Sequence, residues 1–356
     1  MFHQLFVAVN EVRVPKMKTV QKKLLDAHGE VFRAIAAGYL HPFAERRFEK
    51  ARLAVHPTVL VSLDEAFRRA SRWQKPVRPK FGFLFRHERT EKLLEHCPWL
   101  ARVAIHSGDG YLRERAVREL QRPEENAMDL AALLCRCNDH VPQVRELAII
   151  RWAEICRLPR LEALVPVLPV LLDRVPHWQR GGYMALELVR SRPDFRYLLE
   201  AMFLNETSGR LAKRLRYVLR KPDLDVSLGM LATGARSTFV RAVATQAVLQ
   251  GETRYQLGYG WKWIDKTISM RRRVPDWEKR RLDIPDAVRT NTLRAAASDK
   301  SVAVRKLAVD HLIITGPAGY EAELATLRQD KSCAVQWRMD YFDKKWSGKV
   351  SEHKDD

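Results

Sequence analysis

The sequence has few of the features that would place the protein outside the cell or in a membrane. It contains only five cysteines among 356 residues, an odd number in a long chain, so reduced thiols are expected rather than a disulfide framework. Its longest apolar stretch, residues 161–172, contains a glutamate and two prolines and is too short to cross a bilayer. The N-terminus lacks the basic-then-apolar order of a signal peptide. These absences predict a cytoplasmic protein with no membrane partner.

The sequence also lacks the short motifs of common enzymes. It contains no Walker loop, no Gly-x-Ser-x-Gly elbow, no His-Glu-x-x-His pair and no dinucleotide fingerprint. Cys135, Cys137 and His140 lie close together, but their spacing is not a standard zinc pattern. We therefore expect neither a cofactor nor a metal ion, and the usual enzyme classes are disfavoured.

Acidic residues are scarce relative to basic ones. The chain has 63 Lys and Arg against 43 Asp and Glu, a formal net charge of +20. The excess lies in two blocks: residues 1–100 hold 19 basic and 10 acidic residues, and residues 201–300 hold 20 and 10. A positive field of this kind attracts polyanions, so nucleic acid is the first partner to consider. A basic amino-acid composition without a binding function is the alternative.

A pattern recurs along the chain with a period of roughly 30 residues. A polar turn with Asp is followed by an apolar residue, an Arg and an Ala-bearing stretch, as in Asp139 to Ala148 and Asp299 to Ala308. The position of the Arg in each copy defines the period. The interval before position 305 is about twice as long as the others. The marked positions are Arg113, Arg145, Arg180, about 212, Arg241, Arg305 and Gln336.

Apolar residues within each copy fall at helical spacing, as Val304, Leu307, Ala308 and Leu312 do. Each copy therefore predicts one helix of a pair, and preceding segments such as 128–135, 161–172 and 288–297 supply the other. Residues 20–37 and 49–70 are predicted helices outside the repeat. A helical pair cannot bury its apolar face alone, so neighbouring pairs must stack. The predicted fold is all-α, an α-solenoid of helical-pair repeats with an N-terminal helical cap.

The Asp turn followed by Val-Arg-x-x-Ala resembles the HEAT-repeat superfamily and is similar to the short HEAT-like repeats of bacterial proteins. The resemblance covers about residues 101–250 and 286–345. It implies an architecture but no single function, because members of the family include enzymes, scaffolds and nucleic-acid binders. It also implies a ladder between adjacent repeats, in which Asp139, Arg145, Asp299 and Arg305 have structural roles.

The repeat phase divides the chain into five segments. The predicted segments are an N-terminal helical region (1–100), HEAT-like repeats (101–250), a basic and aromatic insert (251–285), C-terminal HEAT-like repeats (286–345) and a polar tail (346–356).

The insert is where we expect the function. Aromatic residues among glycines are followed at once by a run of basic residues, a pairing in which rings stack on bases while cations neutralise phosphates. The alternative is that the tryptophans are hydrophobic anchors of an ordinary repeat. The predicted nucleic-acid-binding residues of the insert are Trp261, Lys262, Trp263, Arg271, Arg272, Arg273, Lys279, Arg280 and Arg281.

Two further basic segments are candidates. Lys75, Arg78 and Lys80 lie in a proline-containing loop over 72–89, whose phenylalanines are instead expected to pack in the N-terminal core. The segment 210–221 places basic residues at helical spacing opposite Leu211, Leu215 and Val218. These basic residues are predicted to bind nucleic acid; the alternative is that they form an ordinary solvated helix face. They are Arg210, Lys213, Arg214 and Lys221.

One enzymatic alternative remains. The set Trp261, Asp265, Arg305 and Trp337 resembles the Trp, Asp and Arg side chains of HEAT-like DNA glycosylases that act on alkylated bases. That resemblance implies that Asp265 stabilises an oxocarbenium-like sugar while the tryptophans hold the damaged nucleotide.

The sequence thus favours a nucleic-acid-binding solenoid that contacts DNA or RNA without sequence preference and positions a partner. The competing hypothesis outside catalysis is a scaffold for an acidic protein partner.

Overall fold

The computed structural model of the protein describes residues 17–37, 43–72 and 94–351. The chain is predominantly helical, and many helices pack against their neighbours in sequence. It divides into two compact units, Met1–Phe195 and Arg196–Asp356. The all-α prediction needs one correction, because the second unit contains a two-stranded antiparallel hairpin.

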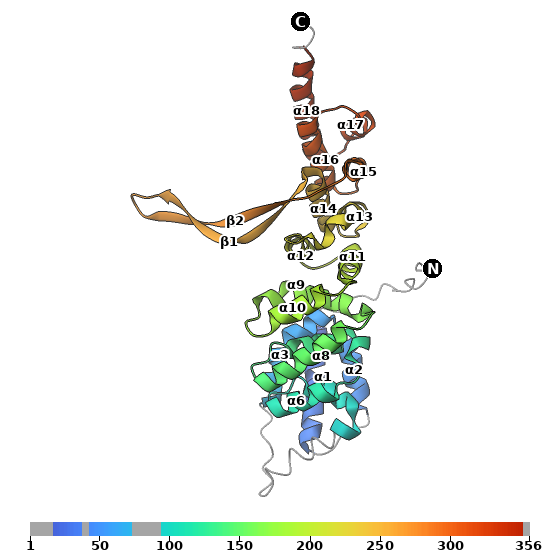
Figure 1. Ribbon diagram of the computed structural model, residues 1–356, viewed down its shortest axis with the longest axis vertical. Coiled ribbons are helices and arrows are strands. Elements are labelled where there is room, and N and C mark those ends of the chain that lie inside the picture. The colour runs from blue at the N-terminus through green and yellow to red at the C-terminus, as the bar shows by residue number, and fades with distance from the viewer. Residues whose placement is uncertain (1–16, 38–42, 73–93, 352–356) are drawn as a thin grey trace, which may run out of the picture. The chain divides into compact units, whose positions relative to one another are not determined.

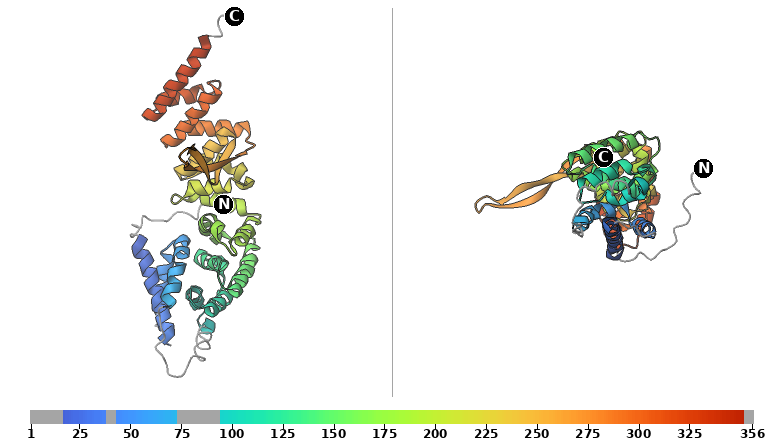
Figure 2. Two further views of the ribbon diagram at one scale, coloured as in Figure 1. Left: turned by 90° about the vertical axis from the view of Figure 1, so that its left-hand side faces the viewer. Right: turned by 90° about the horizontal axis from the view of Figure 1, so that it is seen from below.

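The first unit is built from helices and short 3-10 turns. In it α1, α2 and α3 lie together (blue in Figure 2), and α3 packs on α7. Its elements are α1 (Met17–Ala37), α2 (Ala44–Leu53), α3 (Pro57–Arg72), η1 (Pro98–Leu100), α5 (Ala101–Ala104), α6 (Gly110–Glu119), η2 (Pro123–Glu125), α7 (Ala127–Arg136), α8 (Pro142–Cys156), η3 (Glu162–Val167), α9 (Leu168–Asp173), η4 (Val175–His177) and α10 (Gly182–Arg190).

Two helices predicted for this unit are each divided in the structure, and prolines explain where the divisions fall. The helix expected over 49–70 is divided into α2 and α3, because Pro57 begins a new helix and disfavours helical backbone at the preceding residue. The helix expected over 161–172 becomes η3 followed by α9, with Pro166 inside the 3-10 segment and Pro169 in the first turn of α9.

The second unit carries the hairpin between two pairs of packed helices (Figure 1). Across the hairpin α14 packs on α16 and α13 packs on α15, and one apolar cluster includes Leu249 before it and Leu293 after it. The elements are α11 (Phe195–Asn205), α12 (Leu211–Val218), η5 (Pro222–Ser227), α13 (Leu228–Gly234), α14 (Thr238–Gln250), β1 (Glu252–Asp265), β2 (Met270–Arg281), α15 (Asp286–Ala297), α16 (Val302–Thr315), α17 (Glu321–Arg328) and α18 (Cys333–Ser351).

Arginine–aspartate ion pairs join successive repeats. Arg113 donates from Nε and Nη2 to the two carboxylate oxygens of Asp139, each at 2.8 Å. Arg241 makes the same two-bonded contact with Asp299, at 2.7 and 3.0 Å. Arg305 does so with Asp330, with 3.0 Å between Nη2 and Oδ1. We call each of these contacts a rung.

The acceptor of each rung also fixes the start of its own helix. Asp139, Asp299 and Asp330 each accept a bond from the backbone N–H two residues later, at 3.0, 2.7 and 2.8 Å. The donor in each case is the residue just before the helix (Val141, Ser301 or Ser332), whose N–H has no partner within the helix. These two tasks explain why Asp recurs at this place in the copies of the pattern.

The arginines that define the period make another recurring bond, to the carbonyl six residues earlier. Arg145 bonds to Asp139 in this way at 2.9 Å, and Arg305 to Asp299 at 2.7 Å. The same bond runs from Arg113 to Ser107 and from Arg241 to Ala235, while Gln336 replaces Arg in the last copy and bonds to Asp330. The contacts expected of Asp139, Asp299 and Arg305 between repeats are thus present, whereas Arg145 bonds within its own turn.

Replacing Asp139 by Ala should lower the free energy of unfolding of the first unit by about 3–5 kcal/mol, because it leaves the fully buried guanidinium of Arg113 without its carboxylate. Glu125→Ala breaks an exposed ion pair with Arg122 in the same unit and should cost no more than about 1 kcal/mol. Urea unfolding followed by circular dichroism measures both, and equal midpoints for the two variants would contradict a structural role for the rung.

Candidate nucleic-acid interface

The segment predicted as an insert forms the hairpin of β1 and β2. The strands pair from Glu252 opposite Arg281 to Asp265 opposite Met270, with register irregularities after Gln256 and after Trp263. Figures 1 and 2 show the paired strands standing clear of the helices of their unit. The two ends of the hairpin meet at one point, because the N–H of Leu282 donates to the carbonyl of Gly251 at 2.9 Å.

The base of the hairpin is fixed to α12 and η5. The guanidinium of Arg280 donates to both carboxylate oxygens of Asp225 at 2.7 Å and to the carbonyl of Leu219 at 3.0 Å. The bonds to Asp225 raise the pKa of Arg280. Arg220 bonds to the carbonyl of Gln256, and its guanidinium lies 5.3 Å from the ring centre of Tyr255, which is 9% exposed. Arg280, predicted to contact nucleic acid, thus already binds within the protein.

The far end of the hairpin is a turn organised by Asp265. Its carboxylate accepts the backbone N–H of Thr267 at 2.8 Å and the hydroxyl of the same residue. These bonds to the charged form hold the pKa of Asp265 below its ordinary value. Beside this turn Ile264, Ile268 and Met270 are exposed, an apolar tip that the sequence pattern did not indicate.

Between the two irregularities the side chains separate into two faces. Residues paired across antiparallel strands share a face, and neighbours along a strand alternate. Trp261 faces Arg273 and Trp263 faces Arg271, so these four side chains lie on one side together with Tyr259. We call this side the aromatic face. Gly260, Lys262 and Arg272 lie on the opposite side.

Arginines of β2 lie over the rings of β1. The guanidinium carbon of Arg271 is 4.6 Å from the ring centre of Trp261, and that of Arg273 is 4.5 Å from the ring centre of Tyr259. Each exposed contact of this kind contributes about 0.5–1 kcal/mol. The rings remain open to solvent, since Tyr259, Trp261 and Trp263 are 58%, 59% and 49% exposed. Trp277, the third tryptophan of the insert, is 53% exposed, so none of the three is a buried hydrophobic anchor, the alternative that the sequence left open.

The remaining basic residues of the hairpin differ in their partners. Lys279 is 3.1 Å from a carboxylate oxygen of Glu252, whose other partner is Arg254. These two cations lower the pKa of Glu252. Lys262, Arg272 and Arg281 are exposed.

The predicted basic segment 210–221 lies beside the base of the hairpin. It forms α12, on which β1 packs, and the carbonyl of Lys221 accepts a bond from Arg280 at 3.2 Å. Arg210, Lys213 and Lys221 are exposed. Arg214 was wrongly placed on the solvated face: it is 7% exposed, and its guanidinium packs against Gly209, where a side chain would not fit without a shift. The structure thus brings two of the three predicted basic segments together. Lys75, Arg78 and Lys80 lie outside the described residues.

The four residues of the glycosylase-like set do not share one site. Trp261 and Asp265 lie on the hairpin, which projects away from α16 and α18 (Figure 1). Arg305 is held on α16 by its rung to Asp330, and Trp337 is 69% exposed on α18. The carboxylate of Asp265 is occupied by its own turn.

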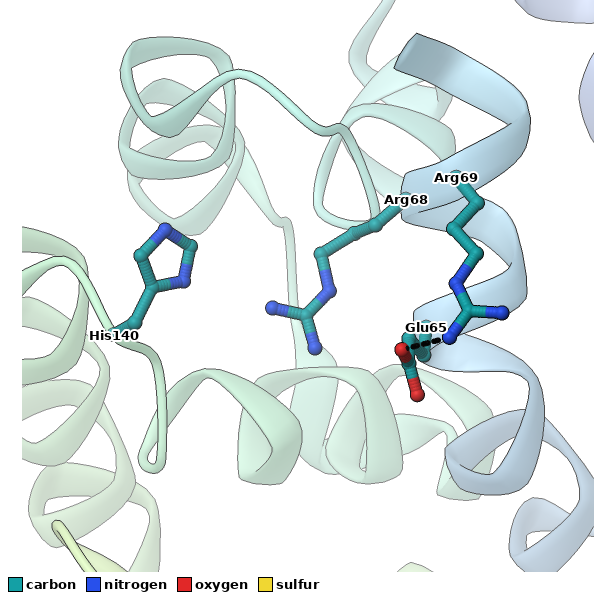
Figure 3. Close-up of a pocket in the computed structure, with 4 residues that line it drawn as sticks. All are labelled: Glu65, Arg68, Arg69 and His140. Atoms are coloured by element: carbon teal, nitrogen blue, oxygen red, sulfur yellow. Dashed lines mark hydrogen bonds and ion pairs between the residues drawn. The ribbon is translucent and has the colours of Figure 1, made fainter. Parts of the chain in front are cut away.

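The first unit offers a small pocket lined by Glu65, Arg68, Arg69 and His140 (Figure 3). Its cations already have carboxylate partners, since Arg69 pairs with Glu65 and Arg68 lies 2.9 Å from Asp64. Among the residues that the structure describes, no group of three or more His, Cys, Asp or Glu side chains is arranged to hold a metal ion. Cys135 and Cys137 are buried, and burial raises the pKa of the Cys135 thiol to about 12.

Comparison of the chain with protein-family models, with curated proteins and with solved structures finds no match. Within the described ranges, no helix is long and apolar enough to span a membrane. Function is therefore inferred from the residues of this chain alone.

Replacing residues 252–281 by a short Gly-Ser linker should leave the second unit folded, because Gly251 and Leu282 are already hydrogen-bonded and the Arg241–Asp299 rung joins the flanking repeats. The hairpin is bonded to the rest of its unit through the carbonyl of Gln256 and the guanidinium of Arg280, so the free energy of unfolding should fall by about 3–5 kcal/mol. Circular dichroism and urea unfolding measure this, and a non-cooperative transition would show that the hairpin is part of the core.

Proposed function

We propose that the protein binds nucleic acid through the hairpin, largely without sequence preference. The observation that carries this proposal is the aromatic face, on which exposed rings alternate with guanidinium groups on a pair of strands that stands clear of the helices. Rings of this kind stack on bases and the cations contact phosphates. Contiguous exposed apolar side chains of this kind mark sites where a partner binds.

The charge of the hairpin supports a polyanion as the partner. Residues 252–281 contain nine Lys and Arg against four Asp and Glu. The exposed residues Arg210, Lys213 and Lys221 add positive charge at its base. Contacts from such residues to phosphates place the protein on the strand but do not identify bases.

Little sequence preference is expected, because stacking on rings and contacts to phosphates do not depend on the identity of the base. Adenine is usually read by Asn or Gln, and the only such side chain in β1 or β2 is Gln256. Its amide donates to the carbonyl of Gly258 at 2.9 Å, so it is engaged within the hairpin.

We also propose that the two units are parts of an α-solenoid of HEAT-like repeats with an N-terminal helical cap. Support comes from the rungs at Arg113, Arg241 and Arg305, which repeat one bonding pattern between successive helical pairs. In this architecture the stack is a rigid mount for the hairpin, and its remaining surface positions a partner on the bound strand.

Changing Arg271, Arg272 and Arg273 together to Ala should weaken binding to random DNA or RNA and reduce the slope of log K against log salt by up to about 3, since each phosphate contact contributes roughly one unit. Fluorescence anisotropy across a salt series measures the slope. The matched control changes Arg157, Arg160 and Arg180, three exposed arginines of the first unit, and removes the same charge.

The proposal predicts a much smaller change in slope for the control. Equal slopes in the two variants would mean that the net charge of the whole protein, and not the hairpin, attracts the polyanion. No complex at micromolar protein and low salt would overturn nucleic-acid binding, and an acidic protein retained after nuclease treatment would then be the partner to identify.

A further inference from the structure

The hairpin contains a regular segment in which every second side chain of β1 is aromatic. Tyr259, Trp261 and Trp263 lie between the two register irregularities, so their alternation is uninterrupted and all three point to the aromatic face. Resting on the nucleic-acid binding proposed above, we infer that this row takes unpaired bases of a single strand, one between Tyr259 and Trp261 and one between Trp261 and Trp263.

The spacing of the rings fits this arrangement. A strand rises about 3.2–3.4 Å per residue, so the Cα atoms of residues two apart along β1 are separated by about 6.4–6.8 Å. Stacked aromatic planes in nucleic acids are about 3.4 Å apart along a strand. The backbone positions that carry successive rings are therefore spaced at close to twice the stacking distance, the spacing that parallel rings need to hold one base between them.

Arginines occupy this space in the free protein. Arg271 faces Trp263 across the strands, yet its guanidinium lies over the ring of Trp261; Arg273 faces Trp261 and lies over Tyr259. A planar guanidinium is thus held against the ring surface that a base would cover. Stacking of a base on an aromatic side chain is stronger than an exposed cation–π contact, so a base displaces the guanidinium.

The displaced arginine keeps a partner. It is carried on β2, directly across from the ring that borders the same gap. We expect it to contact the phosphate next to the inserted base. Each arginine therefore contacts a ring in the free protein and a phosphate when the strand is bound. Its charge has an interaction partner in both states.

A duplex does not fit the row in the same way. Its bases are already stacked and paired, so inserting them between protein rings requires unstacking and unpairing, a cost that a single strand largely avoids. Duplex phosphates still attract Arg271, Arg272 and Arg273, so a duplex binds through charge alone.

The experiment compares three ligands of equal length: single-stranded oligo-dT, the same strand with abasic sites in place of bases, and a duplex. Trp261→Leu removes the ring but keeps an apolar side chain, and Trp261→Phe keeps a ring. The matched control is Trp337→Leu, which removes a comparably exposed tryptophan from α18. Circular dichroism confirms folding of each variant.

We expect Trp261→Leu to weaken binding of oligo-dT by roughly 5- to 150-fold, the range for removal of one stacking side chain, and Trp261→Phe to restore most of it. The same Leu variant should change binding of the duplex and of the abasic strand by less than about threefold, because neither ligand offers a base to the row. Trp337→Leu should leave all three affinities unchanged.

Two outcomes overturn the inference, and they are distinct from failure of nucleic-acid binding itself. If the abasic strand binds as tightly as oligo-dT, or if Trp261→Leu weakens duplex and single strand alike, bases do not enter the row, although phosphate contacts through the arginines would stand. If no oligonucleotide binds while vesicles of anionic lipid do, both the inserted bases and the proposed function are wrong.

Discussion

The two-bonded contact between arginine and aspartate is the interaction on which the helical units depend. Each carboxylate receives the guanidinium of the preceding repeat and also accepts a backbone N–H at the start of its own helix. The contact therefore sets both the distance between neighbouring repeats and the point at which the next helix begins. Buried charges of this kind are tolerated because they are paired and hydrogen-bonded. The need for pairing is greatest at the rung between Arg113 and Asp139, since neither side chain is accessible to water.

The same interaction explains why the repeat was visible in the sequence and where the prediction failed. The Asp and Arg of several copies bond in the same way, so their types and spacing recur, although Arg145 bonds within its own turn. Helix boundaries depended instead on single residues such as Pro57 and Pro166. The inward position of Arg214 depends on the room left by Gly209, which helical spacing does not reveal.

The hairpin was located by composition but its structure was not predicted. Irregular pairing after Gln256 and after Trp263 shifts the alternation of side chains, so no single period of two runs along the strand. Its aromatic and basic residues were recognised as candidates, yet only the pairing across β1 and β2 shows that Trp261 and Trp263 share a face with two arginines. Composition also could not show that Arg280 fixes the hairpin to α12 and η5, or that Asp265 accepts hydrogen bonds within the turn at the far end.

A two-stranded hairpin is marginally stable by itself in water, and its exposed edges invite pairing with other chains. Here the contacts of Arg271 and Arg273 with the rings of β1 add to the backbone pairing of the strands, while like charges along the hairpin oppose association of two copies. Residues proposed to contact nucleic acid therefore also contribute to the order of the free hairpin. At the base of the hairpin, the ion pair of Arg280 and the burial of Tyr255 stabilise the strands further.

The meeting of Gly251 and Leu282 has a consequence for the order of folding. The partners of the other rungs are separated by 26 and 25 residues, whereas Arg241 and Asp299 are separated by 58. If β1 and β2 pair first, the bond between Gly251 and Leu282 shortens the loop that this rung must close to about 28 residues, a length like that of the others. Hairpins form within microseconds. If the strands pair early, closing the loop between Arg241 and Asp299 costs nearly the same conformational entropy as closing the loops of the other two rungs.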